Sequence, residues 1–190
     1  GAKAITRNVT SDYASFTAGA DGIYTPAVGN VNLPTNVFDY NQNIWGTYGS
    51  YTLTTKNKWS IKAGARYEHT DITADFKNKD GQSTVIPPYG VLVPSVNMSK
   101  TFKSGTWRFS YNRRIQRPGI ENLNPNINAT NPLNISQGNP NLAPEYTNNY
   151  EVSYSKFVKQ TYISTALFVR NTTGAISRIR QVTGDVVKTT

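Results

Sequence analysis

Apolar and polar residues alternate with a period of two along several stretches of the chain, and the longest stretch runs from Trp59 to Thr70. Its odd-numbered positions are mostly apolar and its even-numbered positions are polar. Because successive side chains of a strand point to opposite faces, this pattern predicts a strand with one apolar and one polar face. The same alternation predicts further strands around residues 95–102, 107–112 and 150–155.

Two other stretches are less regular. Within residues 38–55 the alternation changes phase near Ile44, Trp45 and Gly46, and we expect a β-bulge there. Residues 162–170 carry apolar side chains on both faces. The spacing of an amphipathic helix is absent from the sequence, and the longest apolar run is far shorter than the roughly 18 residues of a spanning helix. The pattern therefore predicts an all-β protein.

The connections between the predicted strands alternate in length. Short turns are expected at 56–58, 103–105 and 158–160, and long loops at 18–37, 77–90 and 118–144. The last loop is rich in Asn, Pro and Gly, and we expect neither strand nor helix in it. In an antiparallel up-and-down meander, all short turns then lie at one end of the sheet. This arrangement is typical of outer-membrane barrels.

Aromatic residues recur at one depth in three of the predicted strands. Trp59, Trp107 and Tyr162 each lie one or two residues beyond a short turn. Such a row of aromatic side chains forms the girdle of a barrel at the edge of the membrane. Aromatic residues are also good strand formers in any sheet, so the row by itself is compatible with an ordinary β protein.

Composition argues against catalysis. The chain of 190 residues contains no cysteine, one histidine (His69) and 11 carboxylates. A thiolate nucleophile and a histidine-rich metal site are therefore excluded, and we expect no catalytic residue, metal or cofactor. A glycosidase would need two carboxyl groups about 5–10 Å apart in a cleft, and the sequence places no such pair.

The net charge of +9 widens the list of partners to nucleic acid, anionic lipid or an acidic ligand. One alternative is therefore a complete small β-barrel or sandwich that binds glycan or nucleic acid. Such a module would line a water-facing groove with its aromatic side chains. Here the aromatic residues fall on the face opposite the charges, so we expect no nucleic-acid partner.

Three segments resemble TonB-dependent outer-membrane receptors. The stretch GNPNLAPEYTNNYEVSYS at 138–155 closely resembles the GNPxLxPE loop of that family and the barrel strand that follows it. YNRRIQRP at 111–118 looks like the preceding strand exit, and KWSIKAGARYE at 58–68 is similar to another barrel strand. The resemblance covers residues 38–173 and departs from the family at Ala143, where a lysine is common.

This resemblance implies a barrel of about 22 strands in the cell outer membrane, with a plug domain inside. The external loops and the plug apex would bind the ligand, which could be a siderophore, cobalamin, a glycan or a peptide. A TonB-type energy transducer would then act on the plug. We expect residues 1–190 to be one segment of this transmembrane barrel, with seven or eight strands, surrounded by outer-membrane lipid. The plug and the terminal strands would lie outside it.

Five charged residues are candidates for the ligand path. Arg66, Glu68 and Arg108 lie on the polar faces of their strands and are expected to line the lumen. Arg114 and Arg117 lie at a strand exit, where they would attract an anionic ligand or a lipopolysaccharide phosphate. A solvated polar face with ordinary ion pairs would have the same sequence pattern.

The two edge strands of such a barrel segment have unpaired backbone groups and are predicted to pair with another strand. Each unsatisfied backbone group in hydrocarbon costs several kcal/mol, so an open sheet cannot remain in a bilayer by itself. We expect the isolated segment to associate edge to edge with another copy or to close into a small barrel.

Overall fold

The computed structural model describes residues 1–11, 16–26, 37–77, 84–131 and 133–190. Its elements are β1 (Ala2–Ser11), β2 (Phe16–Ala18), β3 (Tyr24–Pro26), β4 (Val37–Thr54), β5 (Trp59–Lys77), β6 (Thr84–Phe102), β7 (Gly105–Gln116), α1 (Ile120–Leu123), β8 (Asn128–Asn131), β9 (Asn134–Ser136), β10 (Glu145–Val158), β11 (Thr161–Thr173), β12 (Arg180–Thr183) and β13 (Val186–Thr189). Among the described residues, no helix is both long and apolar enough to cross a membrane.

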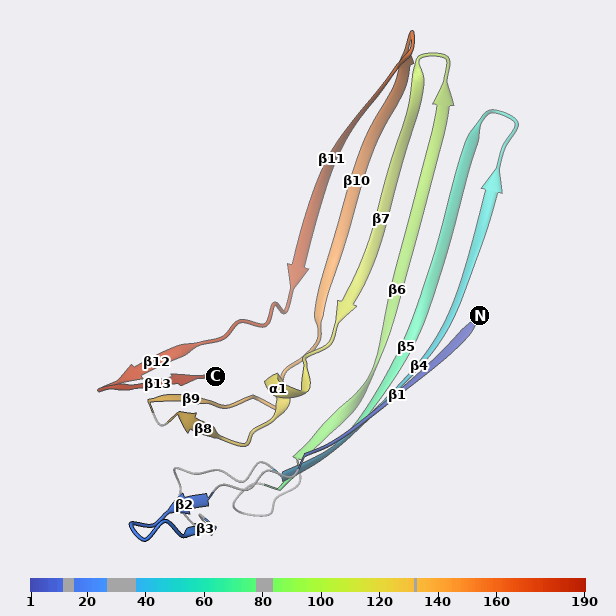
Figure 1. Cartoon of the computed structure of the whole chain (residues 1–190). Coiled ribbons are helices and arrows are strands. Elements are labelled where there is room, and N and C mark those ends of the chain that lie inside the picture. Colours follow the sequence, from blue (N-terminus) through green and yellow to red (C-terminus); the bar gives the residue numbers. More distant parts are fainter. Residues whose placement is uncertain (12–15, 27–36, 78–83, 132) are drawn as a thin grey trace.

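Seven long strands form one sheet in the order β1-β4-β5-β6-β7-β10-β11. Every neighbouring pair in it is antiparallel. Figure 1 shows the three short hairpin turns together at one end of the sheet, called here the turn end, and the small elements gathered at the other, the loop end. The predicted all-β, up-and-down meander is therefore confirmed.

The short turns fall where the sequence predicts them. They join β4 to β5, β6 to β7 and β10 to β11. Lys58 and Lys159 have positive φ angles of 64° and 53°, the left-handed conformation that tight hairpins require. Lysine at these positions keeps the turns charged and exposed to water.

The loop end is more structured than the sequence predicts. Residues 77 and 84–90 belong to β5 and β6, so the expectation of a loop at 77–90 is wrong for them, and residues 78–83 lie outside the described residues. The loop expected at 18–37 contains the β2–β3 hairpin, and its residues 27–36 also lie outside the described part. The expectation for 118–144 is wrong, because this segment contains α1, β8 and β9.

A second sheet in the order β12-β13-β9-β8 forms at the loop end. Its β13–β9 pair is parallel, so this small sheet departs from the antiparallel meander. The pairing joins the last residues of the chain to the Asn-rich segment, and this long-range contact was not visible in the sequence pattern.

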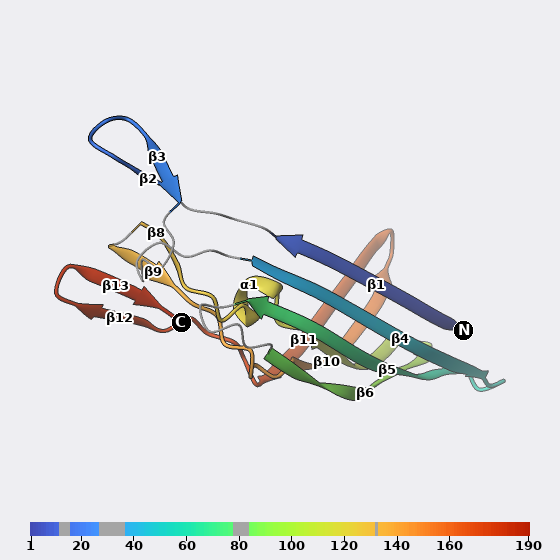
Figure 2. The ribbon, with the colours of Figure 1, turned by 90° about the horizontal axis from the view of Figure 1, so that it is seen from below.

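The large sheet has two chemically different faces. We call the face on which α1 packs the inner face, since Leu123 is 1% exposed there against Phe38, Tyr40, Ala74 and Ile86. Figure 2 shows α1 on one side of the curved sheet, beside β4, β5 and β6. The outer face is the opposite one, and it carries all three tryptophans, Trp45, Trp59 and Trp107, which are 38% to 64% exposed.

The apolar side chains lie on one face in one half of β4 and β5 and on the other face in the other half. This change of face, and not a bulge, explains the phase change in the sequence. The β4–β5 register runs without interruption from Val37↔Lys77 to Thr54↔Ser60, so the bulge expected near Ile44 is wrong. Toward the turn end the apolar residues lie on the outer face. Toward the loop end they lie on the inner face, under α1, while Asp39, Asn41 and Asn43 occupy the outer face.

This switch has a simple physical reason. The strands have 18 or 19 residues in β4, β5 and β6, about twice the 9–11 residues with which a strand crosses a bilayer. The half near the turns presents its apolar side chains outward, as lipid contact requires. The half near the loops has water outside and a small protein core inside, so the apolar side chains face inward.

Candidate functional site

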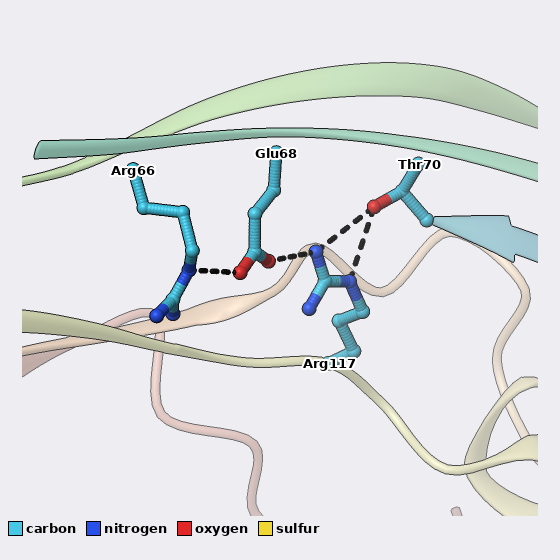
Figure 3. Close-up of polar contacts among 4 residues, drawn as sticks. All are labelled: Arg66, Glu68, Thr70 and Arg117. Atoms are coloured by element: carbon cyan, nitrogen blue, oxygen red, sulfur yellow. Dashed lines mark hydrogen bonds and ion pairs between the residues drawn. The ribbon is translucent and has the colours of Figure 1, made fainter. Parts of the chain in front are cut away.

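The polar cluster of the inner face is built on alternate residues of β5. Arg66, Glu68 and Thr70 follow one another at every second position, so all three point to the same face. Arg117 reaches them from the segment that leaves β7, two strands away in the sheet (Figure 3). The cluster therefore joins the wall of the sheet to the chain that enters the loop end.

Arg117 and Arg66 hold the Glu68 carboxylate from two sides. Arg117 donates from one terminal nitrogen to Glu68 Oε2 at 2.6 Å, and Arg66 donates from Nε to Oε1 at 2.5 Å. Arg117 also donates twice to the Thr70 hydroxyl, at 3.0 and 3.1 Å. The side chains of Arg117 and Glu68 are 17% and 12% exposed, whereas that of Arg66 is 47% exposed.

The chemistry of this cluster is that of an anchor. Guanidinium groups remain protonated in proteins, so neither arginine can act as a base. Charge-assisted hydrogen bonds are the strongest that side chains form, and here they fix Arg117, next to buried Pro118, against β5. The 47% exposure of Arg66 leaves part of its positive charge available on the inner face.

Two tyrosines near the cluster belong to the part of the sheet beyond the apolar band. Burial raises the pKa of Tyr40, and the nearby Tyr89 hydroxyl raises it further. Burial is also the largest cause of the raised pKa of Tyr89, which Arg117 opposes by favouring the ionised form. Both hydroxyls therefore remain neutral at physiological pH and contribute no charge to the inner face.

The five predicted charged residues do not all meet. The structure brings Arg66, Glu68 and Arg117 together. Arg108 lies nearer the turn end, where it donates to the Ser155 hydroxyl at 3.0 Å. Arg114 is exposed on the inner face, opposite Thr147 of β10.

A hollow of about 820 Å³ lies along the inner face and includes most of these residues. Its charged lining residues are Lys3, Lys62, Arg66, Glu68, Arg113, Arg114 and Arg117. Among the described residues that line it, Tyr48 is the one aromatic residue. Stacked bases or sugars need aromatic platforms, so this lining does not favour the alternative of a glycan- or nucleic-acid-binding groove.

The aromatic residues beside the short turns divide between the two faces. Trp59 lies on the outer face with the Lys100 ammonium 5.0 Å from its ring, and Trp107 packs against Tyr154 in a tilted arrangement with ring centroids 4.9 Å apart. Tyr162 pairs with Phe157 on the inner face, at 5.0 Å between the centroids. Distance from a turn sets the depth of a residue, but only its odd or even position sets the face. Tyr162 therefore does not share the outer face of the tryptophans.

Trp45 is a further tryptophan of the outer face that the spacing from the short turns does not predict. It lies on the outer face opposite His69 and is 64% exposed. Trp59 and His69 are ten residues apart, which is about 34 Å along a strand and about 26 Å across a membrane at the usual tilt of about 40°. This matches the apolar band of about 25 Å in outer-membrane barrels. The phase change at Trp45 was the signal, and it marks the far edge of the band.

The segment GNPNLAPE closes the loop end against α1. Gly138 donates its backbone N–H to the Asn124 carbonyl at 2.8 Å, and Asn139 donates to the Asn122 carbonyl at 2.7 Å. A Cβ at Gly138 would lie 2.6 Å from the Asn122 carbonyl oxygen, so only glycine allows this approach. Across the described residues, no group of three His, Asp or Glu side chains could hold a metal ion.

Comparison with known proteins agrees with this architecture. Residues 1–190 match the outer membrane protein beta-barrel family. No curated protein matches the chain. The seven antiparallel strands, the outward apolar band and the charged inner face are those expected of such a barrel. The chain belongs to the outer membrane protein beta-barrel family, and its location is the outer membrane.

Proposed function

We propose that this protein forms part of the barrel wall of a TonB-dependent receptor, which takes up a ligand across the outer membrane with energy supplied from the periplasm. The observation that carries this proposal is the GNPNLAPE segment and the strand after it, which resemble that class of receptor. The first residues of the segment, Gly138 and Asn139, bond to the chain at the end of α1, and its last residue, Glu145, begins β10. In this proposal the segment belongs to the external part of the wall.

The proposed role of the chain is passive and not enzymatic. The outer face contacts outer-membrane lipid, and the inner face surrounds the water-filled path and a plug domain. The loop end gathers the ligand, for which siderophores, cobalamin, glycans and peptides are the candidate classes. The energy transducer acts through the plug, and none of the charged residues described above carries out covalent chemistry.

Growth of deletion strains tests the proposal. The gene for this protein and the gene for the energy transducer are deleted separately, and growth is measured with ferric siderophore, cobalamin, a maltooligosaccharide or a peptide as the limiting nutrient. The expected result is that both strains lose growth on the same nutrient and that plasmid copies restore it. Growth of the receptor deletion on every nutrient that the transducer deletion cannot use would contradict the proposal.

A further inference from the structure

Positive charge dominates the inner face of the sheet. The register places eight cations and three carboxylates on this face within the described residues, namely Lys3, Arg7, Lys62, Arg66, Arg108, Arg114, Arg117 and Arg170 against Glu68, Glu145 and Glu151. The cations occur on β1, β5, β7 and β11 and just after β7, so the charge follows the whole width of the sheet.

The charge is most concentrated in the hollow of about 820 Å³. Lys3, Lys62 and Arg114 line it and have no carboxylate within 4 Å in the described part of the chain. The single carboxylate of the lining, Glu68, is already held by Arg66 and Arg117. The hollow is therefore left with a surplus of positive charge that its own carboxylates do not neutralise.

A concave wall with charges of one sign focuses the electrostatic field and concentrates ions of the opposite sign. Arginine and lysine lining a pore select for anions and phosphates. The volume of the hollow also lies within the range of about 300–1,000 Å³ that holds a small-molecule ligand. Size and charge thus agree on the kind of solute that this wall accepts.

We propose that the inner face binds a small polyanionic solute, one bearing several phosphate or carboxylate groups, in the hollow lined by Lys3, Lys62, Arg66 and Arg114. This inference rests on the proposed uptake function and narrows its ligand class. Lys62 and Arg114 supply the recognition, because their charges are exposed and unpaired by described carboxylates. Arg66 contributes the exposed part of its guanidinium while it also holds Glu68.

Calorimetric titration of the whole protein, purified from outer membranes in detergent, tests the inference with sodium pyrophosphate as the probe and sucrose as a neutral comparison. We expect pyrophosphate to bind and sucrose not to bind. The Lys62→Gln/Arg114→Gln variant should bind pyrophosphate about five- to tenfold more weakly, the product of two partly exposed charge contacts. Raising the salt concentration should weaken binding to the unchanged protein, because salt screens exposed charges.

Lys103→Gln/Lys156→Gln is the matched control, since it removes two exposed positive charges from the turn end and the outer face. It should bind pyrophosphate like the unchanged protein. Equal losses in both variants would show unspecific attraction by surface charge, and no binding at all would show that the hollow does not take up a polyanion; either result would overturn the inference. The titration needs no energy transducer, so its failure is distinct from failure of the growth experiment on which the proposed function depends.

Discussion

At the scale of single residues, the inner face depends on one buried carboxylate. Glu68 lies between two guanidinium groups, and Arg117 is itself only 17% exposed. Removing one partner of such a group leaves the other charge with poor solvation, which costs more than the pair contributes. The fully buried Thr70 hydroxyl adds two further contacts to Arg117.

Glu68→Gln should therefore lower the free energy of unfolding by about 1–3 kcal/mol, because Arg117 loses its charged partner. Urea unfolding of the protein in detergent micelles, followed by tryptophan fluorescence, measures this change. Glu151→Gln is the control, since Glu151 lies exposed on the same face without an ion pair to the described residues. Equal stability of both variants would show that the cluster is an ordinary solvated ion pair.

Alkaline pH should destabilise the protein through Tyr40 and Tyr89. Burial raises the pKa of both hydroxyls above the ordinary value of 10.0. The unfolded chain ionises first as the pH rises, so the contribution to stability is complete below pH 10 and is lost above it. The double variant Tyr40→Phe/Tyr89→Phe should lose less stability above about pH 10 than the unchanged protein.

The free energy of unfolding, measured below and above about pH 10, tests the contribution of Tyr40 and Tyr89. Tyr24→Phe serves as the control, because Tyr24 is 71% exposed on the β2–β3 hairpin at the loop end and is not part of the buried pair. Identical profiles for the double variant and the unchanged protein would mean that the two hydroxyls ionise as readily in the folded state.

At the scale of elements, the sequence was sufficient for the strands near the turns and insufficient near the loops. From Trp59 to Thr70 a single alternation corresponds to a single environment, lipid on one side and water on the other. Beyond Thr70 the apolar residues of β5, Ile72 and Ala74, lie on the inner face. There they belong to the cluster around Leu123 of α1. Which face is covered depends on a segment about 50 residues away in the chain, so local pattern could not reveal it.

The candidate site follows the same rule. The face of Arg66 and Glu68 was predictable because both belong to β5 and the period of a strand is two. The contact of Arg117 with Glu68 was not, because it depends on the path of the chain after β7. For Tyr162 the distance from the turn predicts the depth correctly. Its face is not predicted, because the register of β10 with β11 places it beside Phe157 on the inner face.

The tryptophans should report the two edges of the apolar band. Trp59 and Trp107 lie near the turn end, and Trp45 lies about 26 Å away across the membrane, so quenching by lipids brominated near the headgroup should affect all three more than bromine at the chain ends. Single-tryptophan variants with Phe at the other two positions allow this measurement in vesicles. Strongest quenching of Trp45 by bromine at the bilayer centre would contradict the assigned band.

At the scale of the whole molecule, the directions of the outermost strands limit how the barrel closes. Seven strands alternate in direction from β1 to β11, so the first and the last run the same way. Bacterial barrels consist of an even number of antiparallel strands. Antiparallel closure therefore requires an odd number of further strands between β11 and β1. Two copies with the same orientation in the membrane would again bring parallel edges together.

The isolated 190-residue chain should consequently form dimers in detergent through antiparallel β11 edges. A two-fold axis through the middle of Thr161–Thr173 would bring Leu167 opposite Leu167 of the second copy. Because the chain contains no cysteine, Leu167→Cys should form a disulfide-linked dimer on oxidation. Ala63→Cys is the control, since Ala63 lies on the outer face of β5, between two paired strands, and should give no disulfide-linked dimer on oxidation. A monomer whose β1 and β11 amides both resist hydrogen exchange would instead demonstrate closure through a parallel seam.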